Sequence, residues 1–195
     1  MTQAPLMDRI HITEDYDVPR VINGGWQLSA GHALERPLDL ADASRAFNRL
    51  IDMGFDTFDC ADIYTGVEDF FGGIIRDRRK AGLRLPQIHT KFVPDLNDLA
   101  NVTPAYVENI ITRSLRRLGV ERLDAVQFHW WDYSVPGMVD VAGELVRLQE
   151  KGLIRLISTT NFNAVKLRKL IDAGIPVATN QCQYSVLDRR PAMRL

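Results

Sequence analysis

The sequence predicts an α/β protein built on a TIM-type (β/α)8 barrel, here incomplete, with about six strands and five helices. Two observations support this prediction. Short apolar runs alternate with amphipathic helical patterns, and strands separated by helices favour a parallel sheet with right-handed crossovers. In addition, Gly24-Gly25 is followed by Trp-Gln-Leu-Ser and not by the G-x-G-x-x-G phosphate loop that is typical of an open doubly wound sheet. A barrel is therefore favoured.

The six apolar runs are the predicted parallel strands, and near the end of each lies a side chain of a kind that can bind or react. The runs cover residues 20–27, 55–62, 87–92, 124–130, 155–162 and 177–184. The side chains near their ends are Trp26, Asp59, Lys91, His129, Asn161 and Gln181. The carboxyl ends of parallel barrel strands face one rim, where barrel enzymes keep their active sites. The sequence therefore indicates an enzyme.

Five amphipathic patterns between the runs predict helices, and each closes on a glycine that suits a helix C-terminus. They cover residues 39–54, 67–82, 103–119, 138–152 and 163–174. The third pattern is the clearest, because Thr103 is a good N-cap and Pro104 fits the first helical position. Asn163 suits the N-cap of the fifth. The second pattern is the weakest, since Gly72-Gly73 interrupts it.

The length of the chain sets an expectation about its completeness. With 195 residues and 46% hydrophobic composition, the chain can bury one core, so residues 1–195 are expected to form a single domain. A (β/α)8 barrel runs to about 250 residues. The chain is therefore expected to be truncated and to lack the two C-terminal βα units. Open barrel edges and an open apolar interior would favour self-association.

Charge and cysteine usage limit the expected partners and compartment. The 24 Lys and Arg against 25 Asp and Glu give a net charge of −1, which offers no long-range attraction to nucleic acid or to an anionic membrane. The basic cluster at residues 76–80 is expected to be a solvated helix end. No signal-peptide pattern and no apolar stretch of about 18 residues occurs. Cys60 and Cys182 form no CxxC pair and are expected to be buried, reduced thiols of a cytoplasmic protein.

The residues expected to carry the chemistry are Asp59, Tyr64, Lys91 and His129, because neighbouring strands lie about 4.8 Å apart and their ends can converge. A free tyrosine has a pKa of about 10, which is too high for efficient proton exchange near neutral pH. The Lys91 ammonium favours phenolate and lowers that pKa, while Asp59 can keep the lysine charged and oriented. His129 can donate to a substrate carbonyl. These groups suit protonation of an oxygen while hydride from a nicotinamide reaches its carbon.

Several motifs resemble those of the aldo-keto reductase superfamily. GGWQL, FDTFDCADIY, IHTKF and DAVQFHWW are similar to its first four strands, in this order. STTNF and TNQCQYSVLDRRP are similar to the fifth and sixth strands, which contact the cofactor, so the resemblance runs from about Arg20 to Pro191. It implies reduction of a small aldehyde or ketone to an alcohol, with NADPH preferred as the hydride source and NADH as the alternative. It implies no metal.

The resemblance also implies a role for each matching residue. Tyr64 would be the general acid, Lys91 and Asp59 would tune it, and His129 would orient the carbonyl. The other implied site residues are Thr160, Asn161 and Gln181 as cofactor contacts, and Trp26 and Trp130 as walls of the substrate pocket. The chain departs from the family's Gly-(Val/Leu)-Ser-Asn-Phe at residues 158–162, where Ser158 replaces the glycine.

Two alternatives to a working reductase stay open. The chain could be a non-catalytic fragment or a regulatory binding protein that kept the motifs but lost its affinity for the cofactor. A metal-dependent barrel hydrolase that uses Asp59, Asp62 and His129 is less favoured, because Lys91 and Tyr64 have no place in it and no HxH pair is present.

Overall fold

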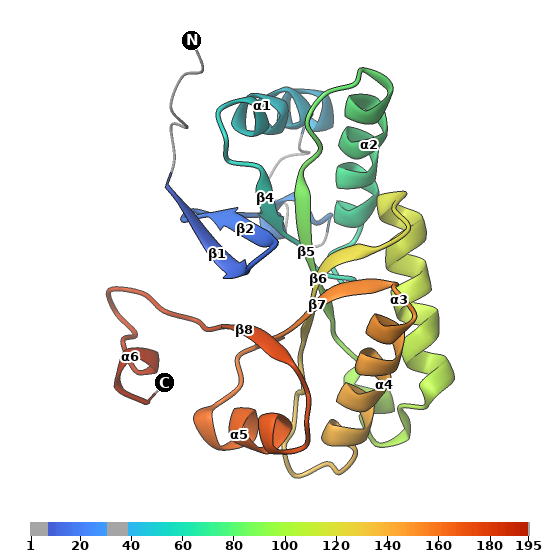
Figure 1. Cartoon of the computed structure of the whole chain (residues 1–195), viewed down its shortest axis with the longest axis vertical. Coiled ribbons are helices and arrows are strands. Elements are labelled where there is room, and N and C mark those ends of the chain that lie inside the picture. The colour runs from blue at the N-terminus through green and yellow to red at the C-terminus, as the bar shows by residue number, and fades with distance from the viewer. Residues whose placement is uncertain (1–7, 31–38, 195) are drawn as a thin grey trace. The chain divides into compact units, whose positions relative to one another are not determined.

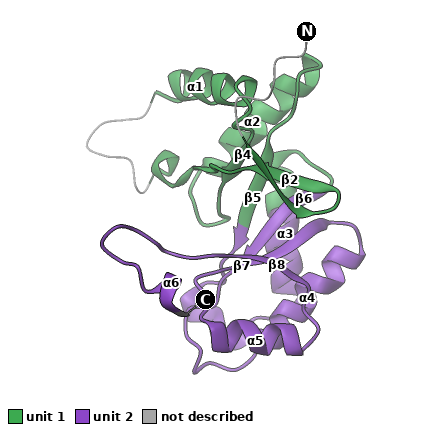
Figure 2. Ribbon diagram, turned by 60° about the vertical axis from the view of Figure 1, so that its left-hand side comes forward, with its two compact units in different colours: residues 1–90, 114–121 green, residues 91–113, 122–195 purple. Residues whose placement is uncertain are grey.

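The computed structural model describes residues 8–30 and 39–194, which group into two compact units. Unit one contains the residues up to 90 together with 114–121, and unit two contains 91–113 together with the residues from 122 onward (Figure 2). β5 (Gln87–Phe92) and α3 (Pro104–Leu118) contribute residues to both units. The expected single domain over residues 1–195 stays a prediction.

Unit one combines a hairpin with the first three parallel strands (Figure 1). In the hairpin, β1 (Arg9–Thr13) pairs antiparallel with β2 (Tyr16–Pro19). The parallel strands follow in the order β3 (Asn23–Gly24), β4 (Thr57–Asp59) and β5. The connecting helices are α1 (Leu40–Asp52) and α2 (Val67–Lys80). The apolar runs therefore predicted the three parallel strands, whereas the hairpin was not anticipated.

Local signals explain where the helices of unit one begin and continue. The Asp39 carboxylate accepts the amides of Ala41 and Asp42 and so caps α1. α2 runs without a break through Gly72-Gly73, where the sequence prediction was weakest. A Cβ at Gly72 would lie only 2.0 Å from the Arg117 carbonyl oxygen. Glycine at this position therefore lets α2 approach the end of α3 closely, and this packing offsets its low helix propensity.

An aromatic cluster forms the core of unit one and holds α1 and α2 against β4. The Phe58 and Phe71 rings are stacked with their centroids 5.3 Å apart. The Phe47 ring of α1 meets both of them edge-on, at 5.1 Å and 5.4 Å. Edge-to-face and offset stacked contacts at these distances are favourable. The cluster fixes β4, whose last residue is Asp59.

Unit two contains the last three parallel strands in the order β6 (Leu123–Phe128), β7 (Ile154–Thr160) and β8 (Val177–Gln181). Its other helices are η2 (Leu96–Asn101), α4 (Met138–Glu150), α5 (Ala164–Asp172) and α6 (Pro191–Arg194). The expected caps are confirmed: Thr103 Oγ1 accepts the Tyr106 amide at 3.2 Å, and Asn163 Oδ1 accepts the Lys166 amide at 2.9 Å. β7 is buried along nearly its whole length, whereas β8 has no buried residue.

Two side chains differ from the sequence expectations. Arg78 does not belong to a solvated helix end: it is buried, pairs with Asp52 at 2.7 Å and donates to Asn48, because its guanidinium reaches back to α1. Cys60 is buried as expected, but Cys182 is only partly so, and the two form no disulfide with each other. No helix in the part of the chain that the structure describes is long and apolar enough to cross a membrane.

Candidate active site

In unit one, the candidate site consists of Asp59 at the end of β4 and Tyr64 in the loop that leads to α2. The backbone holds Tyr64 on both sides, since its amide donates to the Ala61 carbonyl and its carbonyl accepts the Val67 amide, each at 3.1 Å. The pKa of Tyr64 is raised to about 12, chiefly by burial and in addition by the nearby Asp59 and Cys60. The phenol is therefore protonated at neutral pH and has a proton to donate.

The first predicted strand contacts Asp59 through a backbone hydrogen bond. The Gly25 amide donates to the Asp59 carbonyl at 2.8 Å, and a Cβ at Gly25 would lie 3.0 Å from that same oxygen. Glycine is therefore needed for this close approach of two chain segments. Trp26 lies after β3 has ended, in the 3-10 helix η1 (Trp26–Leu28), and is 46% exposed. Such an exposed indole can meet a ligand.

In unit two, Lys91 and His129 lie on two chain segments that a backbone hydrogen bond joins. Lys91 is buried near the end of β5, and the His129 amide donates to the carbonyl of Phe92 at 3.0 Å. Burial lowers the pKa of His129 below its ordinary value, and the positive charge of Lys91 also lowers it, against the effect of the Thr160 carbonyl. The imidazole is therefore neutral at pH 7.

The contact of the His129 ring with the backbone decides which nitrogen carries the proton. Nδ1 lies 3.2 Å from the Thr160 carbonyl oxygen, which can only accept a hydrogen bond. This contact favours the tautomer with hydrogen on Nδ1, so Nε2 of the neutral ring is an acceptor. Donation from His129 to a substrate carbonyl stays a prediction, and in this ring orientation it requires an additional proton on Nε2.

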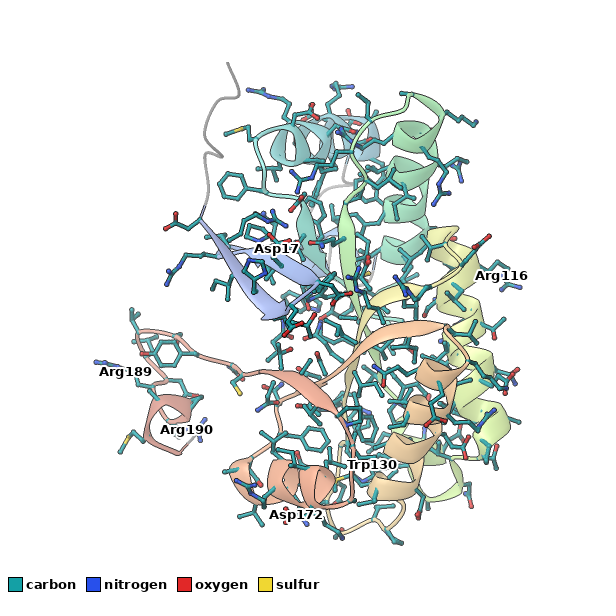
Figure 3. The ribbon with its side chains drawn as sticks, in the orientation of Figure 1. Asp17, Arg116, Trp130, Asp172, Arg189 and Arg190 are labelled. Atoms are coloured by element: carbon teal, nitrogen blue, oxygen red, sulfur yellow. The ribbon has the colours of Figure 1, made fainter. Side chains whose placement is uncertain are left out.

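Two neighbouring tryptophans lie differently from the expectation that Trp130 walls the substrate pocket. Trp130 is buried beside α4, and its Nε1 donates to the Val135 carbonyl at 3.3 Å (Figure 3). Trp131 is instead 48% exposed, and its ring meets the His129 ring edge-on with centroids 4.5 Å apart. Its Nε1 donates to the Pro94 carbonyl at 2.8 Å. Trp131, which the sequence reasoning did not single out, thus directly contacts a candidate site residue.

Asn161 follows β7 in a backbone conformation that few residues adopt. Its φ is 59°, and among the described residues it is the only one other than glycine with a positive φ. The Asn161 amide donates to the Gln181 carbonyl at 2.7 Å, and its Oδ1 accepts the Gln183 amide at 3.1 Å. Asparagine tolerates this conformation better than most residues. With Oδ1 engaged, the side-chain NH2 is the part of Asn161 that can donate to a ligand.

The cofactor contacts expected from the sequence lie together in unit two. Thr160 Oγ1 is 3.4 Å from Gln181 Oε1, and Thr160 pairs with Gln181 in the parallel register of β7 and β8. Asn161 and Gln181 are both exposed at these strand ends. Exposed amides that carry both donors and acceptors are chemically suited to pair with the carboxamide of a nicotinamide.

Asn180 is a residue with a clear role that the sequence reasoning missed. Its Nδ2 donates to the Phe162 carbonyl at 3.0 Å, and its Oδ1 accepts from Thr159 Oγ1 at 2.9 Å and from the Phe162 amide at 3.3 Å. These bonds fix the backbone of Phe162, the residue that directly follows Asn161. The signal that could have revealed it is a second amide directly beside Gln181, on the opposite face of the same strand.

Unit two thus brings together Lys91, His129, Thr160, Asn161 and Gln181, and unit one brings together Asp59 and Tyr64. Each group lies at the carboxyl ends of parallel strands, which agrees with the rim position expected from the sequence. In the described ranges, 8–30 and 39–194, no group of three or more His, Cys, Asp or Glu side chains is arranged to hold a metal ion.

Comparison with known proteins identifies the family. The model of the aldo/keto reductase family matches residues 20–195. Methylglyoxal reductase DkgA of Yersinia pestis is 29% identical over 96% of this chain and 60% of its own length. Chloroplastic pyridoxal reductase of Arabidopsis thaliana is 29% identical over 84% of this chain and 45% of its own length. The NADH-specific methylglyoxal reductase of Escherichia coli is 27% identical, with 91% and 58% covered. The chain thus spans between 45% and 60% of these relatives.

Solved structures agree on the fold. A thermostable aldo-keto reductase superposes with a TM-score of 0.79 at 23% identity, over 96% of this chain and 66% of that one. The Bombyx mori aldo-keto reductase in complex with NADP gives a TM-score of 0.73 at 22% identity, over 91% of this chain and 58% of that one. The expected fold class, a TIM-type (β/α)8 barrel that is incomplete here, is confirmed.

Proposed function

This chain belongs to the aldo/keto reductase family, and we propose that it supplies the proton donor and the nicotinamide-binding residues for reduction of a small aldehyde or ketone to an alcohol. The observation that supports this best is the grouping in unit two. Lys91 acts electrostatically on His129, and the His129 ring contacts the backbone carbonyl that precedes Asn161. A lysine, a neutral histidine and an exposed amide are groups that such a reaction can use.

Tyr64 is the proposed proton donor. Its phenol is protonated at neutral pH, and its loop is held by backbone hydrogen bonds. A phenol with a pKa of about 12 is a weak acid, so a nearby positive charge is required to help the proton leave. We assign that charge to Lys91 and assign to Asp59 the role of keeping Lys91 charged and oriented.

His129 is assigned an orienting role at the reacting oxygen. As a neutral ring with its proton on Nδ1, it offers an acceptor at Nε2, which suits the hydroxyl of the alcohol product. It does not compete with Tyr64 as the proton donor, because its lowered pKa disfavours the imidazolium.

A nicotinamide dinucleotide, when bound, supplies the hydride. Asn161 and Gln181 are the residues proposed to hold its carboxamide, with Thr160 as a neighbouring contact, because their amides are exposed at adjacent strand ends. We propose NADPH as the preferred cofactor and NADH as the competitor. A relative crystallised with NADP supports the first, and a relative named as NADH-specific supports the second.

The substrate is proposed to be a small carbonyl compound that meets the exposed indoles of Trp26 and Trp131, in place of the buried Trp130. Relatives named as methylglyoxal reductases make methylglyoxal a reasonable probe. Cys60 and Cys182 form no disulfide with each other, which supports a location in the cytoplasm, where thiols stay reduced.

The experiment is a comparison of Tyr64→Phe and Lys91→Met with the parent chain, with methylglyoxal and NADPH or NADH, followed by the loss of nicotinamide absorbance. Tyr64→Phe should lower turnover by roughly 10²-fold or more, the lower range for general acid catalysis, while the affinity for NADPH changes little. Lys91→Met should act in the same direction. Turnover that survives in Tyr64→Phe would contradict the assignment of the proton donor.

A further inference from the structure

A buried carboxylate lies directly behind the loop that carries Tyr64. Glu68, in the first turn of α2, is 1% exposed. Its Oε1 accepts a hydrogen bond from Thr90 Oγ1 at 2.7 Å, and its Oε2 accepts one from Arg117 Nη1 at 3.2 Å. A carboxylate in such surroundings persists as an anion only if it is paired and hydrogen-bonded. Arg117 is its cationic partner, so the two side chains form a coupled unit.

The same guanidinium nitrogen reaches the loop itself. Arg117 Nη1 donates at 3.0 Å to the carbonyl of Asp62, two residues before Tyr64. The loop between β4 and α2, residues 60–66, belongs to no strand or helix, so its shape depends on such contacts. The junction with α2 has no side-chain cap, since Gly66 occupies the N-cap position with a φ of 80°. Arg117 therefore supplies a constraint that the helix start does not.

Two further features keep Arg117 in place. A Cβ at Gly72 would overlap the Arg117 carbonyl, so the α3 backbone at this residue is in direct contact with α2. Thr90, which holds the other oxygen of Glu68, is fully buried in β5 and immediately precedes Lys91 in the chain. The network of Arg117, Glu68 and Thr90 therefore extends from the loop that carries the proposed acid to β5. Its last member, Thr90, is the residue directly before the lysine that is proposed to tune the acid.

From these contacts we infer that Arg117 is a positioning residue for Tyr64: it binds the Asp62 carbonyl with an orientation fixed by buried Glu68 and so holds residues 60–66 in the shape that presents the phenol. The inference rests on the proposed role of Tyr64 as the acid. Arg117 acts through the loop backbone and touches no reacting atom.

The test compares four chains: the parent, Arg117→Ala, Arg117→Ala with Glu68→Gln, and Arg116→Ala. Arg116 is the matched control, because it is the preceding residue of α3 and its side chain extends into solvent (Figure 3). The double variant removes the unpaired buried charge that Arg117→Ala would leave, so it should regain stability without regaining the loop contact. It thereby separates positioning from general destabilisation.

The first readout is hydrogen exchange, which needs no activity. Amides of residues 61–67 should exchange about tenfold faster in both Arg117 variants, while amides of β6 to β8 and all amides of Arg116→Ala stay as in the parent. The inference is overturned if exchange of these residues is unchanged in Arg117→Ala, or returns to the parent value in the double variant.

The second readout is the split between turnover and binding. Both Arg117 variants should lose about tenfold or more in kcat, because small misplacements of a reacting group are costly, while the Kd for NADPH stays within about twofold. Equal loss of kcat and NADPH affinity would contradict a positioning role. If Tyr64→Phe retains turnover, the proposed function fails, yet the exchange experiment still decides whether Arg117 shapes the loop.

Discussion

His129 makes the folded protein sensitive to acid at the scale of one residue. Burial lowers its pKa below the ordinary value of 6.5. The unfolded chain therefore binds the proton first as the pH falls, and the free energy of unfolding should decrease from about pH 6.5 downward. A His129→Gln variant should lose stability less steeply between pH 7 and pH 5 than the parent, as measured by urea unfolding at each pH. Parallel curves for the two proteins would contradict a lowered pKa.

The tautomer of His129 is a second outcome of the same geometry. If the ring donates from Nδ1 to the Thr160 carbonyl, ¹⁵N chemical shifts at pH 7.5 should show a protonated Nδ1 and a bare Nε2. The opposite pattern would restore the expectation that Nε2 donates to a substrate carbonyl.

Asn161 and Gln181 are expected to act in cofactor placement more than in proton transfer. Replacing both with alanine should weaken NADPH binding by roughly 1–3 kcal/mol if polar groups of the complex are left unpaired. Isothermal titration calorimetry measures the change directly. Gln183→Ala is the matched control, because its side chain is exposed and only its backbone amide contacts Asn161. An unchanged affinity in the double variant would leave both amides with purely structural roles.

The sequence predicts polar residues at strand ends well and their surroundings poorly. Lys91, His129 and Asn161 could be located because a parallel βα order alone brings strand ends to one rim. The roles of Trp131, Asn180 and the buried Arg78 could not, since each depends on which backbone carbonyl or side chain meets it in three dimensions. The partners of such residues lie between 18 and 37 positions away in the chain.

At the scale of elements, helix limits were the most predictable feature, because caps and stops are local. Thr103 and Asn163 cap their helices as expected, and Gly54, Gly119 and Gly152 all have positive φ. The hairpin at the start of the chain was less visible, since Asp15 and Asp17 interrupt its apolar pattern. Arg9 neutralises Asp17 across the strands, which only the fold reveals.

The two adjacent glycines of α2 give a prediction for that helix. Gly72→Ala should destabilise the protein by about 1–3 kcal/mol, because the new methyl group would meet the Arg117 carbonyl and force α2 away from α3. Gly73→Ala should stabilise it by about 0.5–1 kcal/mol, since its nearest neighbour is the flexible end of Arg76 at 3.7 Å and alanine favours the helix. Urea unfolding measures both. Equal effects at the two positions would contradict the close packing.

At the scale of the whole molecule, the alternation of strands and helices, together with the absence of a G-x-G-x-x-G loop, predicted the barrel class, but neither observation identifies the substrate. Two relatives with the same 29% identity are named for different substrates, methylglyoxal in one case and pyridoxal in the other. The reason is physical: a few pocket side chains decide which carbonyl compound fits, while overall identity reports mainly the shared core.

Self-association is the remaining prediction for the molecule as a whole. β8 has no buried residue, and the segment after it carries Val186 and Leu187, which are 92% and 95% exposed. Burying a valine or leucine side chain stabilises a contact by roughly 1.5–3 kcal/mol, so two adjacent ones favour association of copies. We therefore expect sedimentation velocity to show dimers or larger species whose fraction rises across about a hundredfold range of protein concentration. Val186→Ser with Leu187→Ser should shift the protein toward monomer, whereas Leu83→Ser, at a half-exposed site in unit one, should not. A parent chain that stays monomeric over the whole range would show that these side chains do not drive association.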